Sequence, residues 1–391
     1  MTIKFLNLQQ KFCQTLVAST MLTMSAANAE LAAYPQSTYV TGITFKTSTV
    51  KRLAPGSDNW AMSWGADDHQ YTTWGDGGGF NGNNNDGRVS LGFGRVEGTK
   101  DNYVGVNIWG GKNAVSPAKF EGKSLGVLDI AGTLYAWRNG AGSGTGAFDE
   151  STLYISTDKF VTLSSTDVIF NSSDFPNTKG FFSPTFLQFG KGYTGSRDEY
   201  VYVYANENQN DIWDAQKPGK ISLFRVLKTE IDQKSKYQFF NGLDSNNNPK
   251  WTSNISERKP VFEDSANGIM RTSASYNAGL KRYFLTTQQV SRYQSGNGHI
   301  GVYEAPEPWG PWSTVLFENA WSTGIQINGK KSVFWNFSNK WMSADGKDFV
   351  IVYTDNDEWA TMEGYFDVGE INSQIPVPTT PTGVSVSKSI K

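Results

Sequence analysis

Hydrophobic residues in this chain occur in short runs rather than at helical spacing. The runs are rich in Val, Ile, Tyr, Phe, Trp and Thr, and they are bounded by Gly, Asn, Asp or Pro. Such runs are typical of β-strands joined by tight turns, whereas apolar positions three or four residues apart are hard to find. The pattern therefore predicts an all-β protein.

One pattern recurs five times: a first run, a tight turn with Gly or Asp, and a second run that carries aromatic residues. The copies lie at residues 60–74, 126–137, 184–204, 272–287 and 340–353. Further runs fit between the copies as outer strands, at residues 89–96, 151–156, 221–226 and 299–304. Because this spacing leaves room for four strands and their loops in each copy, we expect a five-bladed β-propeller. The alternative is a two-sheet sandwich with accessory strands.

The two ends of the chain differ from its body. Residues 1–29 combine two lysines, an apolar run and an Ala-Asn-Ala ending, which predicts a cleaved signal peptide. The apolar run is shorter than the roughly 20 residues of a membrane-spanning helix. Residues 371–391 are rich in Pro, Thr, Ser and Val, and we expect a flexible tail there. Residues 30–370 then form one propeller domain of a secreted or periplasmic protein, with the segment up to about residue 42 closing the ring.

Composition excludes several classes of function. The formal net charge is −2 and the basic residues are scattered, which disfavours a nucleic-acid partner. The only cysteine, Cys13, lies in the predicted signal peptide, so no disulfide or thiolate site is expected in the mature protein. With only two histidines, His69 and His299, a histidine metal cluster or a Ser-His-Asp triad has little to be built from. We expect a monomer that needs neither a metal nor a cofactor.

Two aspartates bracket the first copy of the repeat. Asp58 precedes its first run and Asp76 follows its second run, so an antiparallel hairpin would return both carboxyl groups to the same mouth of a propeller. One carboxyl group could protonate a glycosidic oxygen while the other attacks the sugar or activates water. The alternative is a pair of turn aspartates that bind their own backbone. The surrounding tryptophans favour a sugar site, since their flat rings stack on sugar faces.

Other polar and aromatic residues at the ends of the predicted inner strands could bind sugar hydroxyl groups or stack on rings. These substrate-binding candidates are Asn59, Trp60, Trp74, Arg271, Tyr276, Asn277, Trp335 and Asn336. Asp67 and Asp68 occupy the tip of the first hairpin, where turn formation explains them without a catalytic role.

Several stretches resemble the domain catalogued as domain of unknown function 4185. They are residues 56–60, 74–77, 91–96, 275–283 and 304–312. Members with an assigned activity form glycoside hydrolase family 183, which are retaining, endo-acting D-arabinanases with a five-bladed propeller and paired catalytic aspartates in the opening motif. The resemblance implies that Asp58 and Asp76 are the catalytic pair of a polysaccharide-cleaving enzyme.

Two other functions remain open from the sequence. A polysaccharide lyase acting on a uronic-acid polymer would need a base and a cation, and the low histidine content disfavours it. A non-catalytic glycan-binding propeller would suit the Asn and Trp content. The sequence also leaves open the exact glycan and the roles of the two aspartates, with Asp58 preferred as nucleophile because of its position on an innermost strand.

Overall fold

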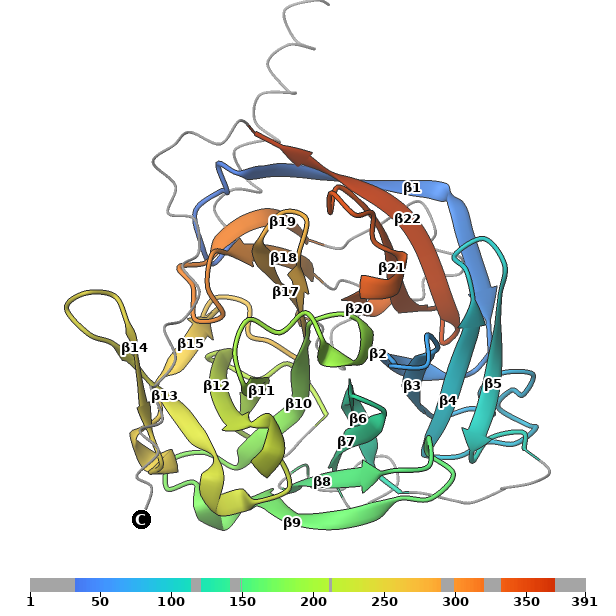
Figure 1. Ribbon diagram of the computed structural model, residues 1–391, viewed down its shortest axis with the longest axis horizontal. Coiled ribbons are helices and arrows are strands. Elements are labelled where there is room, and N and C mark those ends of the chain that lie inside the picture. The colour runs from blue at the N-terminus through green and yellow to red at the C-terminus, as the bar shows by residue number, and fades with distance from the viewer. Residues whose placement is uncertain are drawn as a thin grey trace, which may run out of the picture.

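The computed structural model describes residues 32–113, 121–140, 148, 150–210, 213–289, 299–319 and 332–369. Over these residues the chain is all-β, with 22 strands and short 3-10 helices as its only helical elements (Figure 1). The predicted signal peptide and C-terminal tail lie outside the described residues.

Three of the sheets have four strands each, and neighbouring strands within them are antiparallel. The first sheet contains β2 (Asp58–Trp64), β3 (Gln70–Gly75), β4 (Leu91–Gly98) and β5 (Tyr103–Trp109). The second contains β6 (Lys123–Ile130), β7 (Thr133–Asn139), β8 (Glu150–Ser156) and β9 (Ser164–Asn171). The last contains β20 (Ser332–Phe337), β21 (Asp348–Asp355), β22 (Trp359–Val368) and the N-terminal strand β1 (Val40–Leu53).

The remaining strands form a larger sheet. Its first part contains β10 (Gly180–Gln188), β11 (Tyr200–Asn208), β12 (Lys220–Leu227), β13 (Gln238–Leu243), β14 (Pro249–Thr252) and β15 (Pro260–Glu263). Its second part contains β16 (Arg271–Asn277), β17 (Arg282–Gln289), β18 (His299–Ala305) and β19 (Ser313–Asn319). The two parts are joined where β10 and β16 pair in parallel. The 3-10 helices are η1 (Ser172–Asp174), η2 (Lys191–Tyr193), η3 (Lys228–Glu230), η4 (Lys234–Lys236), η5 (Ile255–Glu257) and η6 (Asn339–Trp341).

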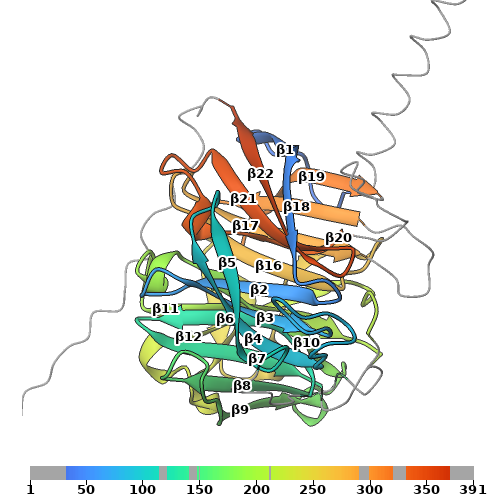
Figure 2. The same ribbon diagram turned by 90° about the vertical axis from the view of Figure 1, so that its right-hand side faces the viewer.

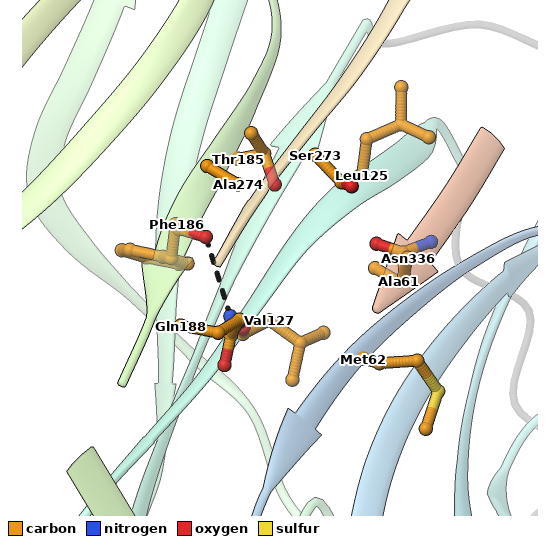
Figure 3. Close-up of a pocket in the computed structure, with 10 residues that line it drawn as sticks. All are labelled: Ala61, Met62, Leu125, Val127, Thr185, Phe186, Gln188, Ser273, Ala274 and Asn336. Carbon is orange, nitrogen blue, oxygen red and sulfur yellow. Dashed lines mark hydrogen bonds between the residues drawn. The ribbon is translucent and has the colours of Figure 1, made fainter. Parts of the chain in front are cut away.

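The first strand of each small sheet, and of each part of the larger sheet, lies at the centre of the molecule. For the last sheet this strand is β20. Strands β2, β6, β10, β16 and β20 contact one another in turn, and β20 contacts β2 again (Figures 1 and 2). A small central cavity of about 10 Å³ is lined by residues from all of these strands (Figure 3). The inner strands therefore surround a common axis, with the other strands of each sheet stacked outward.

The N-terminal strand completes the last sheet. Strand β1 pairs with β22 from Val40↔Val368 to Leu53↔Trp359, so the two ends of the described chain meet in one sheet. The sequence led us to expect this role for the residues up to about 42, and the strand that fills it extends to Leu53.

The fifth copy of the predicted repeat was placed incorrectly. Its expected first run, residues 340–343, is not a strand, because the chain turns there in η6. The Ser338 hydroxyl accepts a hydrogen bond from the backbone N–H of Trp341, and this turn buries the Trp341 ring. The innermost strand is instead β20, so Trp335 and Asn336 belong to that strand rather than preceding it. The hairpins predicted in the other four copies correspond to β2–β3, β6–β7, β10–β11 and β16–β17.

Candidate active site

Pairing between β2 and β3 brings Asp58 and Asp76 to the same end of the first hairpin. Asp58 is the first residue of β2, and its partner across the ladder is Gly75, the last residue of β3. Asp76 follows Gly75 directly. A Cβ atom at Gly75 would lie only 2.7 Å from Asp58 Oδ1, so glycine allows the carboxyl group to lie against the neighbouring strand.

Two cations contact Asp76 from outside the hairpin. Lys123, the first residue of β6, places Nζ 2.7 Å from Asp76 Oδ1 and 3.3 Å from the carbonyl oxygen of Ser90. Arg88 Nη2 lies 3.3 Å from the same carboxylate oxygen. The Asp76 side chain is 40% exposed whereas that of Lys123 is 10% exposed, so the lysine approaches from the protein interior.

Asp58 has a different electrostatic environment. Burial raises the pKa of its carboxyl group to about 6. The positive charge of Lys123 opposes this rise in pKa, and the nearby negative charge of Asp76 adds to it. More weakly, Arg271 lowers the pKa and Asp357 raises it. The two aspartates therefore differ: Asp76 is held in ion pairs, whereas Asp58 can carry a proton close to neutral pH.

Asn59 and Arg271 connect the start of β16 to this site. Asn59 Nδ2 donates to Asp58 Oδ1 at 2.7 Å, and Arg271 Nε donates to Asn59 Oδ1 at 2.5 Å. Both side chains are buried, and burial lowers the pKa of the Arg271 guanidinium to about 10. Of the predicted substrate-binding residues, Asn59 contacts Asp58 directly and Arg271 is linked to Asp58 through Asn59. Both side chains are buried rather than exposed to a ligand.

Trp60 and Trp74 flank the acid pair in sequence but point into the core. Both are fully buried, and their ring centroids lie 5.7 Å apart. Phe80 and Trp359 complete the cluster, with ring centroids 5.1 and 5.3 Å from that of Trp60. This placement does not support the expected stacking on a sugar, since protein side chains cover the rings. The two tryptophans instead pack the first sheet against the last.

The other predicted substrate-binding residues do not gather around Asp58. Tyr276 and Asn277 end β16, about 20 Å along the strand from Arg271 at its start. The Asn277 side chain holds a turn, donating to the carbonyl oxygen of Gly346 and accepting from the N–H of Leu280.

Trp335 and Asn336 also face the protein interior. Trp335 is buried in the core around the last sheet. Asn336 lines the central cavity and donates to the carbonyl oxygens of Trp60 and Phe334 (Figure 3).

Sequence reasoning missed Lys123, the cation closest to the acid pair. A lysine by itself does not indicate a functional site, but the position of Lys123 does. Lys123 is the first residue of the inner strand β6, just as Asp58 is the first residue of the inner strand β2. The predicted run in that copy began at Gly126, after the bulge between Lys123 and Gly126. Placing the strand start three residues earlier would have identified Lys123.

A metal-binding role finds no support in the part of the chain that the structure describes. No group of three or more His, Cys, Asp or Glu side chains there could hold a metal ion. The Asn-rich loop at residues 81–87 is stabilised internally: Asn83 and Asp86 form a β-bridge, and Asp86 pairs with Lys112 at 2.7 Å. The described residues also contain no helix with the length and hydrophobicity needed to span a membrane.

The arrangement is suited to acid–base chemistry on one bond. A carboxyl group that can carry a proton and an ion-paired carboxylate lie at the same end of one hairpin, with Lys123 and Arg271 beside them. Glycoside cleavage with two carboxyl groups requires such a difference between the two.

Several solved structures are similar in outline at low identity. An α-L-arabinofuranosidase from Podospora anserina has 9% identity and a TM-score of 0.44, covering 81% of this chain and 92% of that chain. A GH43_1 enzyme from Xanthomonas citri has 10% identity and a TM-score of 0.45, with 82% and 91% covered. The RS223 β-xylosidase has 10% identity and a TM-score of 0.46, with 81% and 94% covered. At these values the likeness carries no conclusion about the chemistry of this protein.

No curated protein matches the sequence significantly. Asp58 and Asp76 lie before the part of the chain that matches a protein family, which begins at residue 136. Residues 136–324 match the family described as "Domain of unknown function (DUF4185)", which confirms the resemblance to this domain over that part of the chain.

Proposed function

We propose that this protein is a secreted glycoside hydrolase with a five-bladed β-propeller fold, and that Asp58 and Asp76 are its catalytic residues. The observation that carries the proposal is the pairing of β2 with β3, which brings Asp58 and Asp76 to the same end of one hairpin in unlike electrostatic environments. The contacts of five inner strands around one cavity support the propeller.

In the proposed mechanism Asp58 is the general acid/base and Asp76 is the nucleophile. Asp58 protonates the leaving oxygen, Asp76 attacks the anomeric carbon, and water then releases the glycosyl group with Asp58 as base. This reverses the sequence-based preference for Asp58 as nucleophile. The reason is physical: burial raises the pKa of Asp58 to about 6, whereas Lys123 and Arg88 neutralise Asp76.

The proposed substrate class is a polysaccharide, with an endo-acting, retaining D-arabinanase as the first candidate. This part of the proposal comes from the resemblance to glycoside hydrolase family 183. The match at residues 136–324 supports the family but does not include the segment with Asp58 and Asp76. A fold and a family alone do not fix a substrate, so the choice among glycans depends on the assay.

The proposed location outside the cytoplasm comes from residues 1–29, whose composition predicts a signal peptide. Mass spectrometry of the protein isolated from its natural compartment tests this. An N-terminus at Glu30 would support the proposal, and an intact N-terminus on the cytoplasmic protein would contradict it.

The enzymatic test compares the purified protein with its variants on arabinans and on uronic-acid polysaccharides. We expect cleavage of an arabinan with addition of water, retention of anomeric configuration by NMR, and losses of at least about 100-fold in Asp58→Asn and Asp76→Asn. Asp67→Asn, at the other end of the same hairpin, is the matched control and should retain activity. An unsaturated product absorbing in the ultraviolet would indicate a lyase instead. Binding without cleavage, unchanged in both variants, would indicate a non-catalytic glycan-binding protein.

A further inference from the structure

We propose that Arg271 is a positioning residue that acts through Asn59 to favour Oδ2 as the oxygen of Asp58 that carries the catalytic proton. The inference rests on the proposed function for its catalytic meaning. Its structural part concerns three side chains from two inner strands, Asp58 and Asn59 on β2 and Arg271 on β16.

The orientation of the Asn59 amide follows from its partner. Arg271 Nε lies 2.5 Å from one end of the amide, and a guanidinium can only donate hydrogen bonds. That end is therefore the oxygen, and the other end is the NH₂ group, 2.7 Å from Asp58 Oδ1. Because an NH₂ group only donates, Asp58 Oδ1 must accept. Because a carboxyl carbonyl oxygen is a better acceptor than the hydroxyl oxygen, a proton on Asp58 is favoured on Oδ2.

Contacts of the backbone also hold the arrangement. The backbone N–H of Asn59 donates to Thr354 Oγ1 at 2.9 Å, and Asn59 has a φ of 59°, a conformation that asparagine tolerates better than most residues. Gly75 lies against Asp58 Oδ1 with no room for a Cβ atom. Oδ1 thus lies against both Asn59 and Gly75, and the proposal assigns contact with a substrate to Oδ2.

Arg271 is itself fixed in place. It is 5% exposed, its Nη1 atom lies 3.2 Å from Gln288 Oε1, and its guanidinium carbon lies 4.9 Å from the centroid of the Trp213 ring. Because the Arg271 side chain is buried and its Nε donates to Asn59, it holds the amide rather than facing a sugar.

The charged groups facing Asp58 come from four directions. They are Lys123 on β6, Asp76 after β3, Arg271 on β16 and Asp357 in the turn between β21 and β22. Replacing Asn59 changes none of these charges, so Asn59→Gly isolates the hydrogen bond. Glycine also accepts a positive φ without strain. Without the amide, the ionised form of Asp58 loses a donor and the proton can reside on either oxygen.

The first test needs no substrate. The Asp58 carboxyl is titrated by ¹³C NMR in the full-length protein labelled at aspartate, with Asp58→Asn used to assign the signal. We expect Asn59→Gly to raise the Asp58 pKa by about one unit, because a hydrogen bond to the charged form is lost. Arg95→Gln removes a distant, half-exposed charge on β4 and should leave the Asp58 pKa unchanged. An unchanged Asp58 pKa in a folded Asn59→Gly variant would overturn the proposal.

The second test examines the coupling between Arg271 and Asn59 in turnover. At pH 5, we expect Asn59→Gly and Arg271→Gln each to lower kcat about tenfold or more with KM within about twofold. The kcat of the double variant should be little lower than that of either single variant, since both changes break the same chain of hydrogen bonds from Arg271 through Asn59 to Asp58. Additive losses would mean that Arg271 does not act through Asn59.

The two tests distinguish failure of the positioning role of Arg271 and Asn59 from failure of the proposed glycoside hydrolase function. If the Asp58 pKa rises in Asn59→Gly but the wild-type protein cleaves no glycan, the positioning stands and the proposed function fails. If the wild-type protein cleaves arabinan while the Asp58 pKa does not move, the function stands and the positioning fails. Thermal unfolding of each variant confirms that the compared proteins are folded.

Discussion

Asp58 is held where its ionised form is unfavourable, and this has a consequence for stability. Its pKa is about 6 in the folded protein against 3.8 for an unperturbed aspartate, because burial disfavours the charge. A carboxyl group with a raised pKa stabilises the fold below pH 3.8, and this contribution is lost as the pH rises through 6. At neutral pH, ionised Asp58 therefore works against folding.

The first prediction is that Asp58→Asn stabilises the protein at pH 7.5. The shift in pKa corresponds to about 3 kcal/mol, which partial exposure of the residue reduces to about 1–2 kcal/mol. Chemical denaturation at pH 7.5 and pH 4 measures the effect, which should nearly vanish at the lower pH. Asp76→Asn, at an ion-paired position, should give no such gain. Equal effects of Asp58→Asn at both pH values would contradict the raised pKa.

The second prediction concerns Lys123, whose positive charge is the largest influence opposing the rise in the Asp58 pKa. Lys123→Met should move the Asp58 pKa above 6, so the alkaline limb of kcat/KM shifts to higher pH. Activity should also fall about tenfold or more, since Asp76 loses its 2.7 Å partner. The pH profile of kcat/KM measures both effects. An alkaline limb that moves to lower pH would show that Asp58 is not the acid.

At the scale of elements, the two ends of the β2–β3 hairpin have different roles: one end carries the candidate catalytic residues, and the other carries residues that stabilise the fold. Its open end carries Asp58 and Asp76, while its tip carries Asp67 and Asp68. Asp67 accepts a hydrogen bond from the Tyr71 hydroxyl at 2.7 Å. Asp68 pairs with Lys191 at 3.3 Å and with Lys340 at 3.4 Å. The tip of the hairpin thus contacts η2 and η6, at the end of the hairpin away from the candidate site.

The third prediction is that the tip aspartates are dispensable for turnover. The side chain of Asp68 is 56% exposed, and ion pairs at exposed positions contribute about 0–1 kcal/mol. Asp67→Asn and Asp68→Asn should therefore keep kcat within about twofold and lower the free energy of unfolding by less than about 1 kcal/mol. Steady-state kinetics and denaturation provide the measurements. A loss as large as that of Asp76→Asn would place chemistry at both ends of the hairpin.

This hairpin was predictable because its information is local. Two aromatic runs flank a turn with Asp67 and Asp68, and pairing follows from sequence proximity. Strand β20 was not recognised because its partner β21 lies beyond η6, and the aromatic run that includes Trp341 is closer to β21 in sequence. The local pattern favoured residues 340–343 as the inner strand, whereas in the structure Trp341 ends the 3-10 turn η6.

The candidate site was only half predictable for the same reason. Asp58 and Asp76 belong to one hairpin, so their proximity follows from local pairing. Arg271 was named because it opens a predicted inner strand, whereas Lys123 was missed because the predicted run began at Gly126. The link from Arg271 through Asn59 to Asp58 joins strands far apart in sequence, and no local pattern indicates it. The burial of Trp60 and Trp74 also depends on Trp359 in the last sheet, so a position beside the acid pair in sequence did not mean exposure to a ligand.

At the scale of the whole molecule, the N-terminal strand completes the last sheet by joining β22, which brings the two ends of the described chain together. Backbone pairing along β1 is one contribution to this joining, and the side chains that cross to β21 are another. Arg52 on β1 donates to Asp355 Oδ2 through Nε at 2.9 Å and through Nη2 at 2.5 Å. Lys46, also on β1, lies 3.8 Å from Asp348. Both basic residues pair with β21, but only the first acidic partner is buried.

The fourth prediction is that these two ion pairs differ strongly in their effect on stability. Asp355 is 1% exposed, so Arg52→Met leaves a buried carboxylate without its cation and should cost about 3–5 kcal/mol. Lys46→Met breaks a pair whose side chains are 41% and 66% exposed and should cost less than about 0.5 kcal/mol. Chemical denaturation, together with proteolysis near the N-terminus, compares the two variants. Because the two changes lie on the same strand, equal small losses would mean that backbone pairing with β22 holds β1 in the last sheet without help from Arg52.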